Sequence, residues 1–409
     1  MARPADKATA TWVVRRLREA GFQALFAGGC VRDMLLGIRC NDYDVATDAV
    51  PDQVRALFGR VLLVGAKFGV AMVLHRGRKV EVTTFRSDLS YSDGRRPDGV
   101  RFSTPEEDAR RRDFTINGMF YDPLDGRVID FVGGRDDLRR RVLRTIGRAD
   151  ERFAEDYLRM LRAVRFAVRF EMRMDGGTAR AIRRHAASIA RISGERVFDE
   201  LSKMLTHPAA AAALERLAEL GLARHVLPEL FDPPELWARA ADRAGKLARR
   251  GDLALTLGAM MLELDARAIS RRLRAWGASN DLRDAICWLA ARREEWRTAA
   301  DARLCEFKRL QAGEHFRRLR TIWAVEERRE TGGLSQSRRI ARRAGRIDPD
   351  KINPPPLLTG EDLKKRLGLS EGKQLGRVLA ELRNRQLDEE ISTPREALDL
   401  ARRLVQDAD

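Results

Sequence analysis

The chain has 409 residues and a formal net charge of +17, with 78 Lys and Arg residues against 61 Asp and Glu residues. Its length exceeds one small core, so we expect two or more domains, and its basicity favours a polyanionic partner such as a nucleic acid. Four cysteines without paired spacing argue against a disulfide scaffold or a zinc site and indicate a cytoplasmic location. No signal peptide or membrane-spanning stretch is evident, so we expect no membrane partner.

A buried strand is predicted over residues 24–27, followed by Gly28, Gly29 and a helix with an apolar face. The two glycines allow a tight turn and a close approach of backbone to a ligand. The helix amides and the Arg32 guanidinium would then face an anion, for which a triphosphate is suitable. By itself such a turn more often only redirects the chain in α/β proteins, but the carboxylates after it favour a binding site.

These carboxylates are Asp42 and Asp44. If residues 43–46 form a strand, both side chains project from one face and can share a metal, and carboxylate oxygens suit Mg²⁺. A solvated acidic turn is the alternative. Glu81 argues against that alternative, because an alternating strand over residues 80–85 would place this acid in an otherwise apolar layer. An acid in that position is expected to have a function.

The polar segment 90–99 is rich in turn formers and is either a loop over the active site or an ordinary hairpin loop. After it, Arg112 and Asn117 flank the apolar Phe114 and Ile116, which indicates a segment entering the core. A solvated basic run before a helix is the alternative interpretation, but the apolar residues favour a functional role.

Residues 155–166 are predicted to form one continuous helix, because no Gly or Pro interrupts them. Asp156 and Arg159 would lie on one face, either as an ion pair with each other or as a pair that reads a base. A carboxylate that accepts from the exocyclic amine and a guanidinium that donates to the ring nitrogen would select C and A over U and G. Arg162 and Arg165 continue at three-residue steps, and we expect them to reach phosphate.

In this order the motifs resemble the class II branch of the nucleotidyltransferase superfamily, which contains tRNA CCA-adding enzymes and bacterial poly(A) polymerases. The resemblance covers roughly the N-terminal half and rests on residues 28–33, 42–44, 81–86, 111–117, Asp130 with Gly133 and Gly134, and residues 155–159. It implies that Asp42 and Asp44 hold two Mg²⁺ ions. Glu81 would orient or deprotonate the attacking RNA 3′-hydroxyl, or support the metals from the outer shell. The nucleotide-binding residues would be Gly28, Gly29, Arg32, Arg112, Asn117, Asp156, Arg159, Arg162 and Arg165.

The predicted fold is α+β, with a nucleotidyltransferase head that contains a small mixed sheet and an all-helical remainder. Its predicted domains are the catalytic head (1–146), a helical neck that selects the base (147–208), a helical body for RNA binding (209–350) and a helical tail that anchors tRNA (351–409). A stiff proline-rich linker over residues 351–356 opens the tail, which resembles that of CCA-adding enzymes more than the basic extension of poly(A) polymerases.

The expected function is template-independent addition of CCA to the 3′ end of tRNA from CTP and ATP, with release of pyrophosphate. Poly(A) polymerases and partial enzymes that add only CC or only A share the head motifs and remain alternatives. A non-catalytic tRNA-binding protein is the alternative of another class. The acids Asp42, Asp44 and Glu81 argue against it, because RNA binding alone does not require an acidic metal site in so basic a chain.

Overall fold

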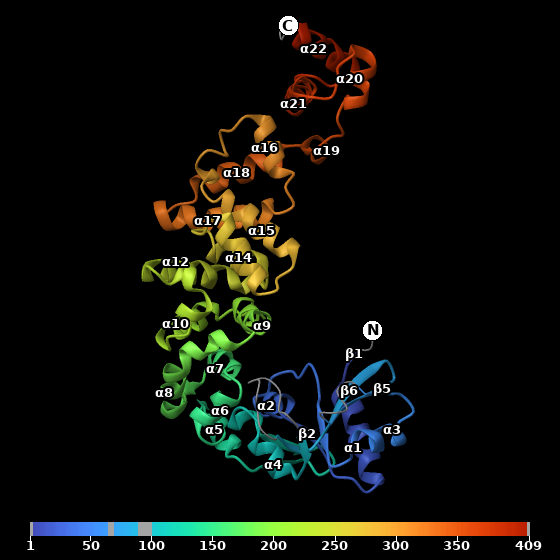
Figure 1. Ribbon diagram of the computed structural model, residues 1–409, viewed down its shortest axis with the longest axis vertical. Helices are drawn as coiled ribbons and strands as arrows, with labels where there is room; N and C mark the ends of the chain where they lie inside the picture. The colour runs from blue at the N-terminus through green and yellow to red at the C-terminus, as the bar shows by residue number, and fades with distance from the viewer. Residues whose placement is uncertain (1–2, 64–68, 89–99, 407–409) are drawn as a thin grey trace. The chain divides into compact units, whose positions relative to one another are not determined.

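The computed structural model describes residues 3–63, 69–88 and 100–406 (Figure 1), so the predicted 90–99 loop lies outside the described residues. The chain forms two compact units, one of Met1–Gly251 with Leu273–Ala278 and one of Asp252–Arg272 with Ser279–Asp409. This division does not test the four predicted domains, which stay a prediction.

The first unit is built on a mixed sheet, as predicted. Its strand order is β10-β9-β2-β3-β6-β5-β4, with β1 beside β6, and β3 and β1 run parallel to β6 while the other pairs are antiparallel. The strands are β1 (Arg3–Pro4), β2 (Ala24–Ala27), β3 (Val45–Thr47), β4 (Val61–Leu62), β5 (Val70–His75), β6 (Arg78–Thr84), β9 (Met119–Asp122) and β10 (Arg127–Asp130). Strands β7 (Arg86–Asp88) and β8 (Val100–Phe102) pair separately.

The parallel register of β3 and β6 sets up the acidic side chains. Val45 pairs with Val82, so Asp44 at the entry to β3 lies beside Glu81 on β6. Along β6 the valines at 80 and 82 are buried while Glu81 alternates to the other face. The prediction that Glu81 sits inside an apolar layer is therefore wrong. The predicted strand over 43–46 is also wrong at its start, because β3 begins at Val45.

Helices cover the sheet and continue beyond it. Helix α1 packs on β2, β3 and β6, and α2 packs on β2 and β9. The helices of this unit are α1 (Lys7–Glu19), α2 (Gly29–Leu35), α3 (Pro51–Leu57), α4 (Pro105–Arg110), α5 (Gly134–Arg139), α6 (Ala149–Glu155), α7 (Leu158–Arg169), α8 (Gly176–His185), α9 (Gly194–Leu205), α10 (Ala210–Glu219), α11 (Ala223–Val226) and α12 (Pro234–Leu247). A two-residue strand, β12 (Arg173–Met174), interrupts the helical region and pairs with β11 (Val142–Leu143).

The predicted continuous helix over 155–166 is broken. Helix α6 ends at Glu155 and α7 begins at Leu158, because Asp156 adopts an extended backbone with φ −156° and ψ 102°. Its carboxylate then accepts a hydrogen bond from the Leu158 amide at 3.1 Å, which satisfies a donor at the start of α7. At this residue the side chain that caps the next helix outweighs the local helix propensity, and the helix is interrupted.

The second unit is helical throughout its described residues. Its helices are α13 (Leu253–Met260), α15 (Asn280–Ala291), α16 (Leu304–Gln311), α17 (Phe316–Thr331), α18 (Ser335–Arg346), α19 (Pro349–Ile352), α20 (Gly360–Leu367), α21 (Lys373–Leu387) and α22 (Pro394–Gln406); α14 (Ala266–Ala275) is divided between the two units. The first two residues of the predicted linker over 351–356 belong to α19.

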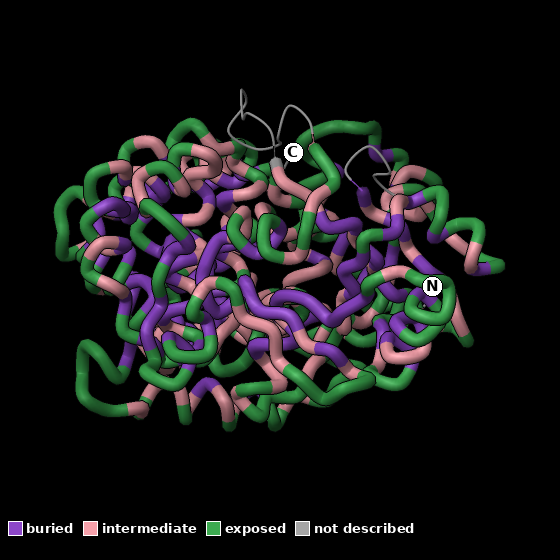
Figure 2. Tube along the Cα trace, turned by 90° about the horizontal axis from the view of Figure 1, so that it is seen from below, coloured by how far each residue is buried: buried purple, intermediate pink, exposed green. Residues whose placement is uncertain are grey.

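The last three helices enclose a small apolar cluster that includes Leu363, Val378 and Ala401. Thr359 caps α20, and Gly368 ends it in the left-handed conformation. Buried segments, purple in Figure 2, alternate with exposed ones along the chain. Across the described residues, no helix is both long enough and apolar enough to cross a membrane.

Candidate active site

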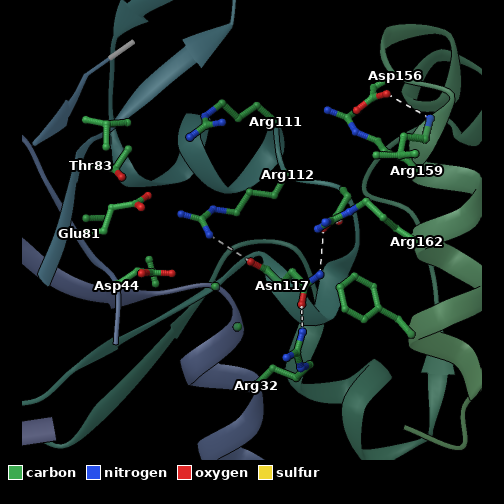
Figure 3. A pocket seen from close by; sticks show the side chains of 18 of the residues that line it. Arg32, Asp44, Glu81, Thr83, Arg111, Arg112, Asn117, Asp156, Arg159 and Arg162 are labelled. Carbon is green, nitrogen blue, oxygen red and sulfur yellow. Dashed lines mark hydrogen bonds and ion pairs between the residues drawn. The ribbon is translucent and has the colours of Figure 1, made fainter. Parts of the chain in front are cut away.

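A cavity of about 590 Å³ in the first unit brings together the motifs found in the sequence. It lies where the β2–α2 turn, the starts of β3 and α7, and the middle of β6 meet (Figure 3). Every predicted site residue except Asp42 lines it: Gly28, Gly29, Arg32, Asp44, Glu81, Arg112, Asn117, Asp156, Arg159, Arg162 and Arg165. Their roles are not tested by this convergence, but the predicted residues share one site.

The acidic end of the cavity carries concentrated negative charge. Burial, with the nearby charges of Glu81 and Asp42, raises the pKa of Asp44 to about 7. Burial and the Asp42 charge also raise the pKa of Glu81. Asp42 thus belongs to the same electrostatic cluster although it does not line the cavity. Its Oδ1 accepts hydrogen bonds from the amides of Ala5 at 3.2 Å and Tyr43 at 3.0 Å.

These acids suit a hard divalent cation. Among the described residues, no group of three or more His, Cys, Asp or Glu side chains is arranged as a metal-binding cluster. Two carboxylates are nevertheless the usual protein share of a Mg²⁺ site, which takes its other ligands from water and substrate phosphates. A cation would also offset the repulsion that raises the pKa of Asp44 and Glu81, so Asp42 and Asp44 fit as ligands.

The glycine turn places backbone against an arginine. Gly28 has φ +74°, a conformation that favours glycine, and a Cβ atom there would lie 2.8 Å from Nη1 of Arg112. Arg112 is held by Asp108, which is buried and accepts from its Nε at 3.1 Å and Nη2 at 2.8 Å. Nη1 of Arg112 also donates to the Asn117 carbonyl at 3.3 Å. The turn therefore requires glycine for both conformation and space.

Arg32 is fixed inside the site. Its Nη1 donates to Oδ1 of Asn117 at 2.6 Å, and its Nε and Nη2 donate to Asp33. The guanidinium also lies 4.3 Å from the ring centroid of Phe170, a distance typical of a cation–π contact. Arg32 is therefore a rigid positive wall of the cavity, and Asn117 links it to the segment that carries Arg112.

Of the two alternatives for Asp156 and Arg159, the ion pair between them is not formed among the described residues. The Asp156 carboxylate instead accepts hydrogen bonds from Nη1 of Arg196 at 3.2 Å and from Nη2 at 2.8 Å. Arg159 pairs through Nη1 with Glu155. The helix break at Asp156 separates the two side chains. Both remain at the cavity wall, where Figure 3 shows them opposite Asp44 and Glu81.

The two following arginines are held by buried acids. Arg162 donates to Asp113 through Nε at 2.9 Å and Nη2 at 2.6 Å, and Arg165 donates through Nε to Glu200 at 2.6 Å. Burial disfavours the charged form of Asp113, but Arg162 and Asn117 outweigh it and lower its pKa to about 2. Both arginines line the cavity while anchored from behind.

Sequence reasoning missed the residues that hold these side chains in place: Asp108, Asp113 and Glu200, which accept from site arginines, and Arg196, which donates to Asp156. A signal existed for Asp108, which stands three and four residues before Arg111 and Arg112, the spacing of helical ion pairs. The other contacts join residues that are 35 to 49 positions apart in the sequence, so no local sequence pattern predicts them.

Comparison with known proteins identifies the family. Residues 24–144 match the family described as "Poly A polymerase head domain", residues 171–232 match "Probable RNA and SrmB- binding site of polymerase A", and residues 249–401 match "tRNA nucleotidyltransferase domain 2". The CCA-adding enzyme of Levilactobacillus brevis is 34% identical over 90% of this chain and 91% of its own. The chain belongs to the CCA-adding enzymes.

Other relatives agree with this assignment. The CCA-adding enzyme of Geobacillus thermodenitrificans is 46% identical, over 56% of each chain. The crystal structure of the Bacillus stearothermophilus CCA-adding enzyme in complex with CTP is 32% identical over 98% of both chains, with a TM-score of 0.80. The Thermotoga maritima CCA-adding enzyme complexed with tRNA shares the fold, with a TM-score of 0.67 at 21% identity.

Family membership confirms the sequence-based resemblance and the α+β fold. It makes the chain a tRNA nucleotidyltransferase, and the family implies a divalent metal. It does not test the roles of individual residues.

Proposed function

We propose that this chain adds CCA to the 3′ end of tRNA from CTP and ATP, without a template, with Asp42 and Asp44 as ligands of Mg²⁺. The observation that carries the proposal is the composition of one cavity, which has acids at one end, the carboxylate of Asp156 and the guanidinium of Arg159 at the other, and arginines between them. This is the charge order that a metal-bound triphosphate with its base at the far end requires. The cytoplasm, where tRNA, CTP and ATP occur together, is the proposed location.

The chemistry divides between the metal and the protein. When bound, Mg²⁺ supplies Lewis acidity at the phosphates and stabilises the departing pyrophosphate. Glu81 receives or orients the proton of the RNA 3′-hydroxyl, a role supported by its place in the cavity wall, where it lies beside Asp44. Arg112, the amides after Gly28 and the rigid Arg32 neutralise and align the triphosphate.

Base selection rests on hydrogen-bonding capacity left free by the anchoring contacts. Each Asp156 oxygen already accepts from Arg196 but retains capacity for an exocyclic amine of C or A. Arg159 uses Nη1 for Glu155 and the Arg152 carbonyl, which leaves its Nε and Nη2 donors for the unprotonated ring nitrogen. Uracil and guanine present the opposite pattern at these positions, so both contacts become unfavourable.

Poly(A) addition is the second candidate, because residues 24–144 match the poly(A) polymerase head family. The deciding experiment supplies purified protein, Mg²⁺, and tRNA that lacks its last three nucleotides, with CTP, ATP or both, and sequences the products. Addition of CCA followed by arrest supports the proposal. Long A tails would assign a poly(A) polymerase, and arrest after CC or a lone A a partial enzyme.

The metal assignment has its own test. Asp42→Ala removes a proposed ligand, so we expect loss of incorporation with RNA affinity close to that of the unmodified chain. Asp52→Ala is the matched control, because Asp52 is an exposed acid on α3 that pairs with Arg55 at 3.8 Å and lies outside the cavity. Incorporation that survives Asp42→Ala would contradict the assignment.

A further inference from the structure

A second, smaller cavity of about 200 Å³ adjoins the active-site cavity. Arg165 and Arg169 line both cavities, so α7 forms the wall between them. Lys203 on α9 and His207 just after it complete the polar lining, and Val168 and Met204 supply apolar surface. We call this space the α7–α9 cavity. None of its polar groups has a part in the chemistry described above except Arg165.

Positive charge in the α7–α9 cavity is only partly neutralised. Arg165 is paired with the buried Glu200, and Lys203 is shared between Asp199 at 2.5 Å and Glu200 at 3.4 Å. Arg169 is exposed, and among the described residues it has no carboxylate partner. Its guanidinium lies 5.1 Å from the centroid of the Phe170 ring, a distance typical of a cation–π contact. A cationic group without a counter-ion therefore faces this space.

His207 adds a neutral donor of defined tautomer. Its Nδ1 accepts a hydrogen bond from the Ala209 amide at 3.2 Å, which assigns the ring proton to Nε2. Burial, with the charge of Arg169, lowers the pKa of His207, so the ring is uncharged at neutral pH. The cavity thus combines cations with an N–H donor, the set that commonly binds a phosphate oxygen.

We propose that the α7–α9 cavity binds a backbone phosphate of the tRNA acceptor strand, through Arg169, Lys203 and Nε2 of His207. The proposal rests on the proposed function, since the RNA strand must reach the active-site cavity next door. Arg169 lies ten residues beyond Arg159 on the same helix, about 15 Å along its axis. That distance exceeds the roughly 3.4 Å rise per nucleotide of a strand, so the cavity serves RNA upstream of the reacting end.

The test measures the affinity for tRNA lacking CCA across a series of salt concentrations. Loss of one phosphate contact reduces the magnitude of the slope of log K against log salt by about 0.7 to 0.9. Arg169→Gln is therefore expected to weaken tRNA binding about 3- to 10-fold and to reduce the slope by about one. His207→Phe keeps an aromatic ring but removes the Nε2 donor together with the Nδ1 acceptor of the Ala209 amide, so it should weaken binding without changing the slope. Arg60→Gln, an exposed arginine between α3 and β4, is the control.

The same variants distinguish RNA phosphate from free pyrophosphate, the other source of this chemistry. If Arg169→Gln alters inhibition by pyrophosphate but neither the tRNA affinity nor the salt slope, the proposal is overturned. The proposal is also overturned if Arg169→Gln binds tRNA with the affinity and salt slope of the unmodified chain. If the unmodified chain still completes CCA ends, that result leaves the proposed function intact. If the unmodified chain extends no tRNA, the proposed function itself fails. Lys203→Gln, at another exposed position, repeats the salt test independently of Arg169.

Discussion

Asp156 and Arg159 stand three residues apart and yet are held by different partners, Asp156 by Arg196 at 2.8 Å and Arg159 by Glu155. The break between α6 and α7 causes this separation. An ion pair between the two would have occupied the groups that the proposed contact with a base needs. Held from behind instead, each side chain keeps hydrogen-bonding capacity toward the cavity and loses little freedom when a nucleotide arrives.

This arrangement predicts that nucleotide selection depends on Arg196 as well as on the reading pair. Asp156→Ala should abolish the preference for C and A over U and G. Arg196→Gln should reduce the ratio of kcat/KM for CTP over UTP by about tenfold, since a charge-assisted hydrogen bond contributes about 1.5 to 3 kcal/mol. Single-nucleotide incorporation with each of the four triphosphates measures both. Arg183→Gln on α8 is the control, and unchanged selectivity in Arg196→Gln would refute the positioning role.

Glu81 and Asp44 should respond differently to amide substitution. Glu81→Gln removes a proton acceptor, so we expect kcat to fall about 100-fold or more while the Mg²⁺ concentration for half-maximal rate stays unchanged. Asp44→Asn removes a proposed ligand and should raise that Mg²⁺ requirement as well. Rates measured across a Mg²⁺ titration separate the two. A higher Mg²⁺ requirement in Glu81→Gln would move Glu81 to a metal-supporting role.

Much of the site was predictable from sequence because its residues follow local rules. The strand–glycine–helix pattern around Gly28 fixes the turn within a few residues, whereas alternation along β6 puts Glu81 on the face opposite the buried valines and not in the apolar layer that we predicted. The same rules place Thr359 and Gly368 at the ends of α20. The family resemblance then predicted that these residues act at one site, and in the structure they line one cavity, except Asp42.

The remainder depends on contacts distant in sequence. The residues within a helical turn of Asp156 do not indicate that Arg196, forty residues later, will contact it. Likewise, the residues near Glu200 do not predict its contact with Arg165. The break at Asp156 was missed for a related reason. Helix propensity is a weak prior, and a side chain that caps the next helix overrides it.

The Asp113–Arg162 pair predicts a stability that depends on pH. The folded pKa of Asp113, about 2, lies below the ordinary value of about 3.9, so the ionised form is favoured by folding. Its stabilisation is complete above about pH 4 to 5 and is lost as the pH falls toward 2. Asp113→Asn should lower the free energy of unfolding at pH 7 by about 2 kcal/mol.

Urea unfolding at pH 7, 5 and 3 checks this prediction, since the difference between Asp113→Asn and the unmodified chain should narrow at pH 3. Asp136→Asn is the control, because its pair with Arg139 is exposed and contributes little. A difference that stays constant with pH would show that the effect arises from packing rather than from the charge of Asp113.

Gly28 and Gly37 form a matched pair that separates backbone strain from the arginine contact. Both have positive φ, +74° and +68°, but a Cβ atom meets Nη1 of Arg112 at 2.8 Å only in Gly28, while at Gly37 nothing lies within 4 Å. Gly37→Ala should cost about 1 kcal/mol of stability through strain, and Gly28→Ala should cost more, because φ +74° with ψ −125° lies outside the left-handed helical region. Gly28→Ala should in addition displace Arg112 and raise the KM for CTP and ATP about tenfold, which thermal unfolding and steady-state kinetics resolve. Equal KM values in the two variants would mean that Arg112 does not contact the triphosphate.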